Sequence, residues 1–287
     1  MRLAYLILAH QLPSQLVRLV ERLRAPETTF LIHVDRKMDD GGFDHVVGSL
    51  CARPEVVLLP RRICHWGTFS VVQASLDGVN HAVREQIPFD YLVLLSGQDY
   101  PIKTRNQIDA VFYEAGGRSF LHHVPLPKCD WHDGGWDRVE RWHFPPGIGN
   151  RLVERVANRV AAPRRFPRGF HPYGGAQFWC LSRRAAEHVE AFARTHTNFF
   201  RFFQHVFVPD ELFFQTALAN SGLRTELVSE CLTFLEWYRP GAVLSSQDFE
   251  SLATTSHLFA RKFDCRIDRD VLDLIDRRLL TSDGRRH

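Results

Sequence analysis

The chain has 287 residues, of which 45% are hydrophobic and 24% are charged, and its formal net charge at pH 7 is +3. This composition is typical of a globular protein with one large α/β domain or two small ones. The small net charge and the scattered arginines argue against a nucleic-acid-binding protein. Six cysteines without a C-x-x-C pair, in a chain with no recognisable secretion signal, indicate buried free thiols and a cytoplasmic enzyme.

The first part of the chain predicts alternating strands and helices. Apolar runs at 3–9, 29–34 and 56–59 predict strands, and apolar residues at helical spacing predict helices at 12–23 and 69–83. A strand–helix–strand opening of this kind favours a parallel sheet with a nucleotide-type crevice beyond its strand ends.

The most informative segment is Tyr91–Pro101, which reads Y-L-V-L-L-S-G-Q-D-Y-P. Its first five residues form an unbroken apolar run, which is typical of a strand buried on both faces. Gln98 and Asp99 follow the strand, at the edge where α/β sheets bind their ligands, and Pro101 is expected to prevent further pairing. The alternative is that Asp99 only hydrogen-bonds the local backbone.

Two earlier strands also end in polar side chains. His10 follows the first strand, and Asp35 follows Val34 at the end of the second. A carboxylate at this position is well placed to accept hydrogen bonds from a ribose or a base. The alternative is that Asp35 pairs with Arg36 or Lys37.

The rest of the chain continues the α/β pattern with one compositional break. The stretch 125–172 is rich in Trp, Gly, Pro and His, and we expect a long irregular insertion there and a short apolar connection at 256–263. The other expected elements are strands at 118–122, 177–181 and 224–235, and helices at 103–113, 183–194, 212–220, 247–253 and 271–280. Without an internal repeat or linker, one domain over residues 1–287 is the simplest prediction.

Within that insertion, Arg151, Arg155 and Arg159 recur at helical spacing and are followed by three more arginines as far as Arg168. The first interpretation is a solvent-exposed helix face. The alternative is contact with an anionic membrane surface that carries a lipid-linked substrate.

Several common catalytic motifs are missing from the sequence. Without a G-x-S-x-G, a phosphate-binding G-x-x-x-x-G-K-[ST] or a G-x-G-x-x-G, the hydrolase, phosphotransferase and dehydrogenase interpretations are disfavoured. The histidines between His122 and His132 fit no established zinc spacing. The D-x-D of Asp268 and Asp270 opens the last helix, where a helix cap is the expected role.

Glu211 is the strongest candidate for acid–base chemistry. It lies in the segment V-P-D-E at the start of a predicted helix, where a carboxylate can act as a general base. The alternative is an acidic residue that only stabilises the helix N-terminus.

Six segments, taken in order, resemble the core-2/I-branching β-1,6-N-acetylglucosaminyltransferase family (glycosyltransferase family 14), which also includes peptide O-xylosyltransferases. These segments are 32–35, 66–74, 95–104, 174–183, 209–211 and 258–264. The resemblance implies a GT-A-like α/β fold with a mostly parallel central sheet flanked by helices. It also implies an inverting transfer from a UDP-sugar, with neither a divalent metal nor another cofactor.

The resemblance further implies roles for individual residues. Glu211 matches the family's catalytic base, and Lys262 and Arg239 match the cations that neutralise the departing UDP in place of a metal. The other implied donor-binding residues are His10, Val34, Asp35, Gln98 and Asp99, and the implied acceptor-binding residues are Trp237 and Tyr238.

We therefore predict a glycosyltransferase that adds GlcNAc in β-1,6 linkage to a hydroxyl of a glycan or glycolipid. One alternative is a UDP-xylose-dependent peptide O-xylosyltransferase, and another is a nucleotide- or carbohydrate-binding protein without catalysis. The expected location is cytoplasmic, with peripheral contact at the inner face of a membrane through residues 151–168.

Overall fold

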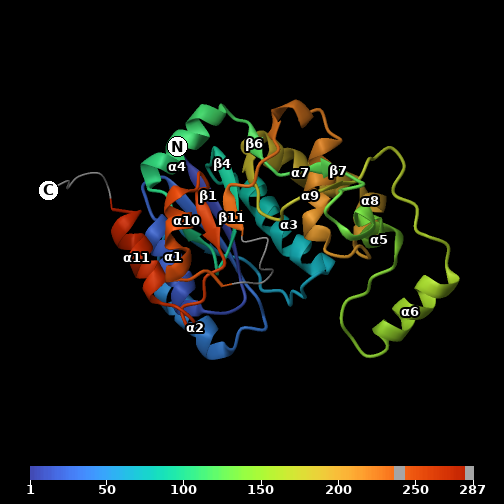
Figure 1. The fold of residues 1–287 in the computed structure, drawn as a ribbon, viewed down its shortest axis with the longest axis horizontal. Helices are drawn as coiled ribbons and strands as arrows, with labels where there is room; N and C mark the ends of the chain where they lie inside the picture. Colours follow the sequence, from blue (N-terminus) through green and yellow to red (C-terminus); the bar gives the residue numbers. More distant parts are fainter. Residues whose placement is uncertain (236–242, 282–287) are drawn as a thin grey trace. The chain divides into compact units, whose positions relative to one another are not determined.

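The computed structural model describes residues 1–235 and 243–281. The protein is mixed α/β, with mostly parallel strand pairing and flanking helices, as predicted (Figure 1). The chain forms two compact units. Unit 1 comprises Met1–Arg61, Pro88–Gly117 and Cys231–His287, and unit 2 comprises Arg62–Ile87 and Arg118–Glu230. The single-domain description stays a prediction.

The core of unit 1 is a parallel sheet of buried apolar strands. Its order is β4 (Tyr91–Ser96), β1 (Leu3–Ala9), β2 (Thr28–Val34) and β3 (Val56–Leu58). Ala9 is in register with Val34, and Leu8 with Ser96, so three strands end at the same edge. The polar residues that follow these strands are therefore brought to one edge, as the sequence predicted.

Five α-helices belong to the described part of unit 1: α1 (Pro13–Leu23), α2 (Asp40–Leu50), α4 (Arg105–Ala115), α10 (Phe249–Thr254) and α11 (Asp270–Arg278). A 3₁₀ turn, η4 (Ser246–Asp248), precedes α10. Helix α2 was not predicted, because it buries only Val46 and Leu50 and so has little apolar periodicity. Its start is fixed instead by Asp39, whose carboxylate accepts a hydrogen bond from Gly42 N at 2.6 Å.

A small second sheet corrects two expectations. Strand β12 (Phe259–Arg261) lies between β11 (Thr233–Leu235) and β5 (Tyr100–Pro101). The segment 256–263 is thus not a mere connection, and Pro101 does not end pairing, since it lies opposite Phe259. Proline is tolerated here because β5 is an edge strand that pairs on one side only.

Unit 2 contains shorter strands than the sequence predicted. Strand β6 (Ser119–Phe120) pairs in parallel with β10 (Leu227–Val228) and antiparallel with β9 (Cys180–Ser182). Strands β7 (Val124–Pro125) and β8 (Tyr173–Gly174) form a separate antiparallel pair. A 3₁₀ turn, η3 (Arg224–Glu226), precedes β10.

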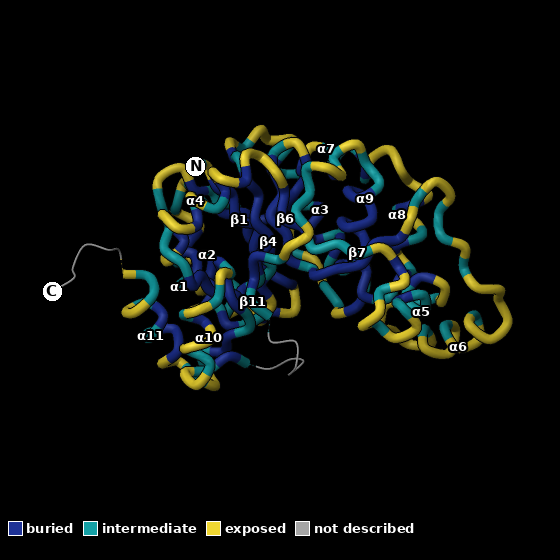
Figure 2. Tube along the Cα trace, turned by 45° about the horizontal axis from the view of Figure 1, so that its top comes forward, coloured by how far each residue is buried: buried dark blue, intermediate teal, exposed yellow. Residues whose placement is uncertain are grey.

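Four helices of unit 2 pack around a cluster of phenylalanines. They are α3 (Phe69–Arg84), α7 (Arg183–Thr195), α8 (Thr197–Phe203) and α9 (Phe213–Ala219), with the 3₁₀ turn η2 (Pro209–Glu211) before α9. Every residue of α9 is buried, as Figure 2 shows. Phe199 and Phe203 of α8 both contact Phe213 of α9, with ring centroids 5.5 and 5.3 Å apart. Helix α8 was not predicted, because its phenylalanine run has no clear helical period.

The insertion at 125–172 is not wholly irregular. It contains η1 (His132–Gly135), α5 (Trp136–Glu140) and α6 (Asn150–Val160). Helix α6 carries the three regularly spaced arginines, all of them exposed, which agrees with the first interpretation of that pattern. None of the helices in residues 1–235 and 243–281 has the length and apolar character that a membrane crossing requires.

All six cysteines are free thiols, as predicted, but only Cys180 is buried. Cys51 and Cys129 are exposed because they lie in a turn after α2 and in the insertion, respectively. The expectation of six buried thiols was therefore wrong.

Candidate functional site

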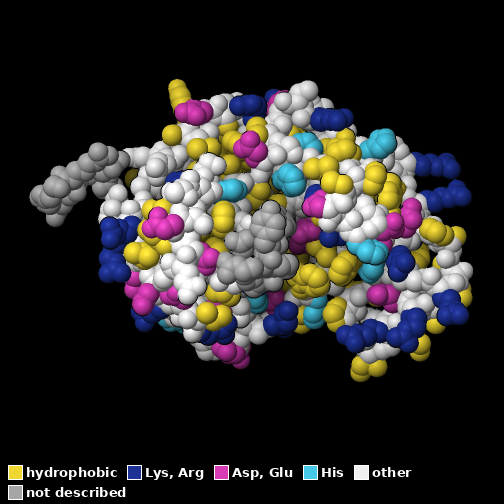
Figure 3. Space-filling view, viewed as in Figure 1, with side chains coloured by type: hydrophobic (Ala, Val, Ile, Leu, Met, Phe, Trp, Pro, Cys, Tyr) yellow, Lys and Arg dark blue, Asp and Glu magenta, His cyan; other side chains and the backbone are white. Residues whose placement is uncertain are grey.

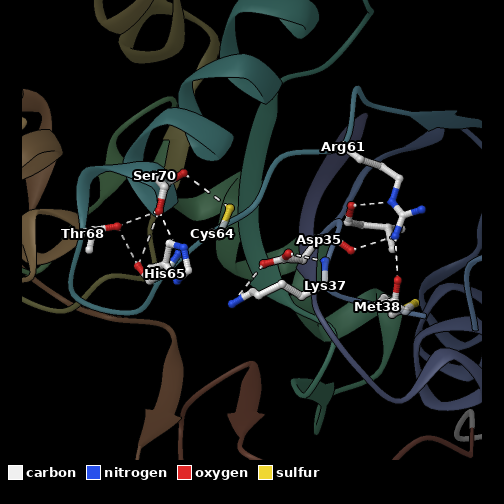
Figure 4. Close-up of polar contacts among 9 residues, drawn as sticks. Asp35, Lys37, Met38, Arg61, Cys64, His65, Thr68 and Ser70 are labelled. Atoms are coloured by element: carbon white, nitrogen blue, oxygen red, sulfur yellow. Dashed lines mark hydrogen bonds and ion pairs between the residues drawn. The ribbon is translucent and has the colours of Figure 1, made fainter. Parts of the chain in front are cut away.

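In unit 1, the segment that follows β2 is held in a fixed turn by Asp35. The Asp35 amide donates to Ala9 O of β1 at 2.7 Å. Its carboxylate accepts from the Lys37 amide at 2.8 Å and lies 3.7 Å from Lys37 Nζ, as Figure 4 shows. The Asp35 side chain is only 3% exposed. The pairing with Lys37 that the sequence left open is therefore present, and the carboxylate orders the local backbone.

Arg61 is a second element of this turn that the sequence analysis missed. Its guanidinium donates to the carbonyl oxygens of Asp35 at 3.0 Å and Met38 at 2.9 Å (Figure 4). The same group stacks 4.0 Å from the centre of the Phe43 ring. Arg61 thus fixes the carbonyls that follow β2, and nothing in its own sequence neighbourhood pointed to this role.

Asp99, after β4, is fully enclosed. Its carboxylate accepts from Ser96 N at 2.9 Å and lies 3.2 Å from the Arg261 guanidinium. Burial raises the pKa of Asp99, while Arg261 and Ser96 act in the opposite direction. With 0% of the residue exposed, Asp99 has no surface for a donor nucleotide. The geometry favours the local hydrogen-bonding alternative for Asp99.

Gln98 ties β4 to the segment that contains Lys262. Its side-chain amide donates to Phe263 O at 3.1 Å, and its backbone carbonyl accepts from Phe263 N at 2.8 Å. Gln15 of α1, which sequence reasoning missed, adds hydrogen bonds to Phe263 O at 3.1 Å and from Cys265 N at 2.9 Å. Two buried side-chain amides, those of Gln98 and Gln15, therefore fix the backbone that directly follows Lys262.

His10 and Lys262 belong to the same electrostatic neighbourhood. Loss of hydration lowers the pKa of His10, and the positive charges of Lys37, Lys262 and Arg261 lower it further, against the opposing effect of Asp35. The His10 ring is therefore neutral at pH 7. Within residues 1–235 and 243–281, no ion pair engages the Lys262 ammonium. This edge of unit 1 thus offers a positively charged side chain.

Three of the predicted site residues lie outside the described residues. They are Arg239, the second cation predicted to neutralise UDP, and the predicted acceptor-binding residues Trp237 and Tyr238.

In unit 2, Glu211 ends the turn η2, and its position is fixed through the backbone. Its carbonyl accepts from Gly175 N at 2.9 Å, and its amide donates to Val208 O at 3.2 Å. The Glu211 carboxylate is 26% exposed, and Oε2 accepts from Arg138 Nη1 at 2.6 Å. In the described part of the chain, Oε1 has no hydrogen-bond partner. One oxygen is therefore held while the other is available.

Arg138 is held in turn by an aromatic ring. Its guanidinium lies 3.5 Å from the centre of the Trp131 ring. Trp131 packs so closely on Gly174 and Gly135 that added Cβ atoms would lie 2.5 and 2.6 Å from its ring. Glycine is thus needed at position 174, in the segment 174–183, for the packing that supports the Glu211–Arg138 pair.

The loop before α3 supports the turn that leads to Glu211. Ser70 Oγ accepts from His65 N at 2.8 Å, and Thr68 Oγ1 lies 2.7 Å from Ser70 Oγ, as Figure 4 shows. These contacts order the backbone around Gly67, whose carbonyl accepts from Val208 N at 3.0 Å. The W-G-T-F-S segment thus holds the start of the V-P-D-E segment.

A cavity of about 250 Å³ lies in unit 2 next to this framework. Its lining includes Trp66, His143 and Phe207, and the Phe207 amide donates to Arg138 O at 3.0 Å. Burial lowers the pKa of His143, so its ring is neutral at pH 7. Aromatic walls with a few polar groups are typical of ligand sites. The backbone of Arg138 is thereby connected to a wall of the cavity.

The two candidate metal patterns have other contacts. His122 Nδ1 accepts from Ala176 N at 3.3 Å, and Asp268 accepts from Val271 N at 3.0 Å, as expected for a residue that caps α11. The described ranges contain no group of three or more His, Cys, Asp and Glu side chains arranged to hold a metal ion.

Comparison with known proteins gives the family. Residues 3–256 match the family described as Branch: Core-2/I-Branching enzyme. The chain belongs to this family. Its members are glycosyltransferases, so the enzyme class predicted from the sequence is confirmed.

Similar proteins include Xylosyltransferase 1 of Homo sapiens, with 25% identity, and Xylosyltransferase 2 of Mus musculus, with 26% identity. Each alignment covers 96% of this chain but only 30% and 33% of the relative, respectively. The chain of this Core-2/I-branching family member thus spans about a third of the length of these relatives. The predicted cytoplasmic location was wrong, because these xylosyltransferases are Golgi-lumenal enzymes.

Proposed function

We propose that this Core-2/I-branching family member transfers a sugar from a UDP-sugar to an acceptor hydroxyl, with inversion at the anomeric carbon and without a metal ion. The observation that carries the proposal is the Glu211 carboxylate, which is accessible and oriented by Arg138 at 2.6 Å. A GT-A-like description of the α/β fold belongs to the same proposal.

In the proposed reaction, Glu211 Oε1 takes the proton from the acceptor hydroxyl. The acceptor oxygen forms a bond to the anomeric carbon while the bond from that carbon to the UDP oxygen breaks on the opposite face. A carboxylate is a weak base, so the proton moves late, when the attacking oxygen has already lost electron density. Arg138 keeps the carboxylate in one orientation and leaves the second oxygen open.

The leaving group is UDP, on which negative charge grows as the bond breaks. Lys262, fixed by the backbone contacts of Phe263, supplies a positive charge with no ion-pair partner in the described residues. We propose that Arg239 supplies a second. His10, neutral at pH 7, and the backbone around Val34 and Asp35 are the proposed nucleoside contacts, with Gln98 and Asp99 as internal supports.

Two sugar nucleotides are candidate donors. UDP-GlcNAc, with β-1,6 linkage to a glycan or glycolipid, is the donor predicted from the sequence. UDP-xylose, with transfer to a peptide hydroxyl, is favoured by the xylosyltransferases among the relatives. We propose the cavity beside Phe207 as part of the acceptor site. Trp237 and Tyr238, which lie outside the described residues, stay the acceptor-binding residues that the family resemblance implies.

The experiment that tests this function measures transfer from UDP-xylose and UDP-GlcNAc to peptide and saccharide acceptors, with the product anomer assigned by NMR. A β-linked product from an α-linked donor supports inversion, and a retained configuration contradicts it. Because Lys262 and Arg239 take the place of a metal, a chelator is expected to leave the rate unchanged. A rate that collapses with chelator and recovers with a divalent cation would remove this part of the proposal.

A further inference from the structure

Helix α6 attaches to unit 2 through its polar side. Glu154 Oε2 accepts from Phe144 N at 2.9 Å. Asn158 makes two hydrogen bonds to the Trp142 backbone, accepting from N at 2.7 Å and donating to O at 2.8 Å. Glu154 and Asn158 are four residues apart and so lie on one side of the helix. That side faces the segment 142–144.

The apolar side of α6 faces solvent. Leu152, Val156 and Val160 recur every four residues, and Val153 lies beside them. Their exposed fractions are 63%, 50%, 76% and 52%, respectively, and no residue of α6 is buried (Figure 2). A surface helix normally directs its apolar side into the protein and its polar side outward. Helix α6 has the opposite orientation.

Arginines flank this apolar side. Arg151, Arg155 and Arg159 are exposed, and none of them forms an ion pair with the residues that the structure describes. The only acidic side chain of α6 is Glu154, which is engaged on the inner side. Figure 3 shows dark blue arginine side chains over α6 with hydrophobic side chains beside them. The outer surface of α6 thus combines apolar area with uncompensated positive charge.

We propose that α6 is a docking helix for an anionic lipid surface. A bilayer supplies, at one depth, an apolar interior for the valines and leucine and phosphate groups for the arginines. Eleven residues of α-helix extend about 16 Å, roughly half of the hydrocarbon thickness, so α6 lies in the plane of the surface and does not span it. The uncompensated charge favours lipid over an uncharged apolar partner.

The test uses the full chain and vesicles of phosphatidylcholine, with or without phosphatidylglycerol. Co-sedimentation is expected with the anionic vesicles, weakly or not at all with the neutral ones, and is expected to decrease as salt rises. Arg155→Gln/Arg159→Gln is expected to weaken binding by about tenfold or more. Leu152→Ser/Val156→Ser is expected to weaken it by a similar factor. All four positions are exposed, so the thermal midpoint is expected to stay unchanged.

The matched control is Arg194→Gln/Arg201→Gln, which removes the same charge from exposed positions on α7 and α8. It is expected to bind anionic vesicles nearly as well as the wild type. Equal losses in the control and the α6 variants would overturn the proposal, since binding would then depend on net charge alone. Absence of vesicle binding, or dimerisation in solution that Leu152→Ser/Val156→Ser abolishes, would also overturn it.

Discussion

Two carboxylates that the sequence singled out, one in each unit, have the same chemistry but different surroundings. Asp99 in unit 1 is fully buried and is engaged by Ser96 and Arg261. Glu211 in unit 2 is 26% exposed, with one oxygen held by Arg138 and the other open. A carboxylate whose oxygens are enclosed by the protein stabilises the fold, whereas a partly exposed one can exchange a proton with a ligand. The exposure of the carboxylate therefore distinguishes a structural role from a proposed catalytic one, and its place in the sequence does so less well.

The largest effect on turnover is expected from Glu211, the partly exposed carboxylate. Glu211→Gln keeps the size of the side chain and removes its basicity, so turnover is expected to fall by about 10²–10⁴-fold, as measured by UDP release. The control is Glu226→Gln, which alters a surface pair with Arg184 in the same unit and is expected to keep the wild-type rate. A Glu211→Gln rate near that of the wild type would show that Glu211 is not the base.

The second-largest effect on turnover is expected from Lys262 of unit 1. Lys262→Met removes the positive charge proposed to stabilise departing UDP, and turnover is expected to fall by about 10²–10³-fold. Lys103→Met is the matched control, because Lys103 is a half-buried lysine of the same unit outside this neighbourhood. Comparable rates for the two variants would contradict the leaving-group role.

The enclosed carboxylate is expected to affect stability. Asp99→Asn removes the buried carboxylate that faces the Arg261 guanidinium at 3.2 Å, and the free energy of unfolding is expected to fall by about 3 kcal/mol. Urea unfolding measures this loss. Asp109→Asn, in a more exposed pair with Arg105, is expected to cost less than about 1 kcal/mol. A stable Asp99→Asn variant with impaired donor binding would reverse the assignment.

The smallest expected effect concerns pH. The pKa of His10 is lowered in the folded state, so the unfolded chain binds the proton first as the pH falls below the ordinary value of 6.5. Because the unfolded chain takes up this proton more readily than the folded protein, His10 lowers the free energy of unfolding on acidification, and the loss is reversed as the pH rises. His10→Gln removes the titrating group, so between pH 7 and pH 5 the variant is expected to lose less unfolding free energy than the wild type. An equal loss in both proteins would contradict a perturbed His10.

The comparison also shows which features a sequence can reveal. Strand β1 was predicted with its observed bounds because a strand buried on both faces is an unbroken apolar run. Glu211 was predicted as the general base from its P-D-E segment, and this role stays a prediction. Helix α2 and strand β12 were missed, because few of their residues produce a periodic pattern and long-range pairing decides their structure.

The supporting residues of the site could not be predicted for the same reason. Arg138 contacts a residue 73 positions away, and Gln15 contacts Phe263, 248 positions away. Such contacts depend on the completed fold and leave no local signature. The enclosure of Asp99 was likewise invisible, since a strand end that is open in one α/β protein is covered by a second sheet in another.

The central claim is that Lys262 binds the nucleotide diphosphate whereas Glu211 acts only on the acceptor proton. Calorimetric titration of UDP into the wild type, Glu211→Gln and Lys262→Met tests it most directly. The account predicts nearly wild-type affinity for Glu211→Gln and an affinity lower by about tenfold or more for Lys262→Met. Unchanged UDP affinity in Lys262→Met, or a comparable loss in Glu211→Gln, would contradict it.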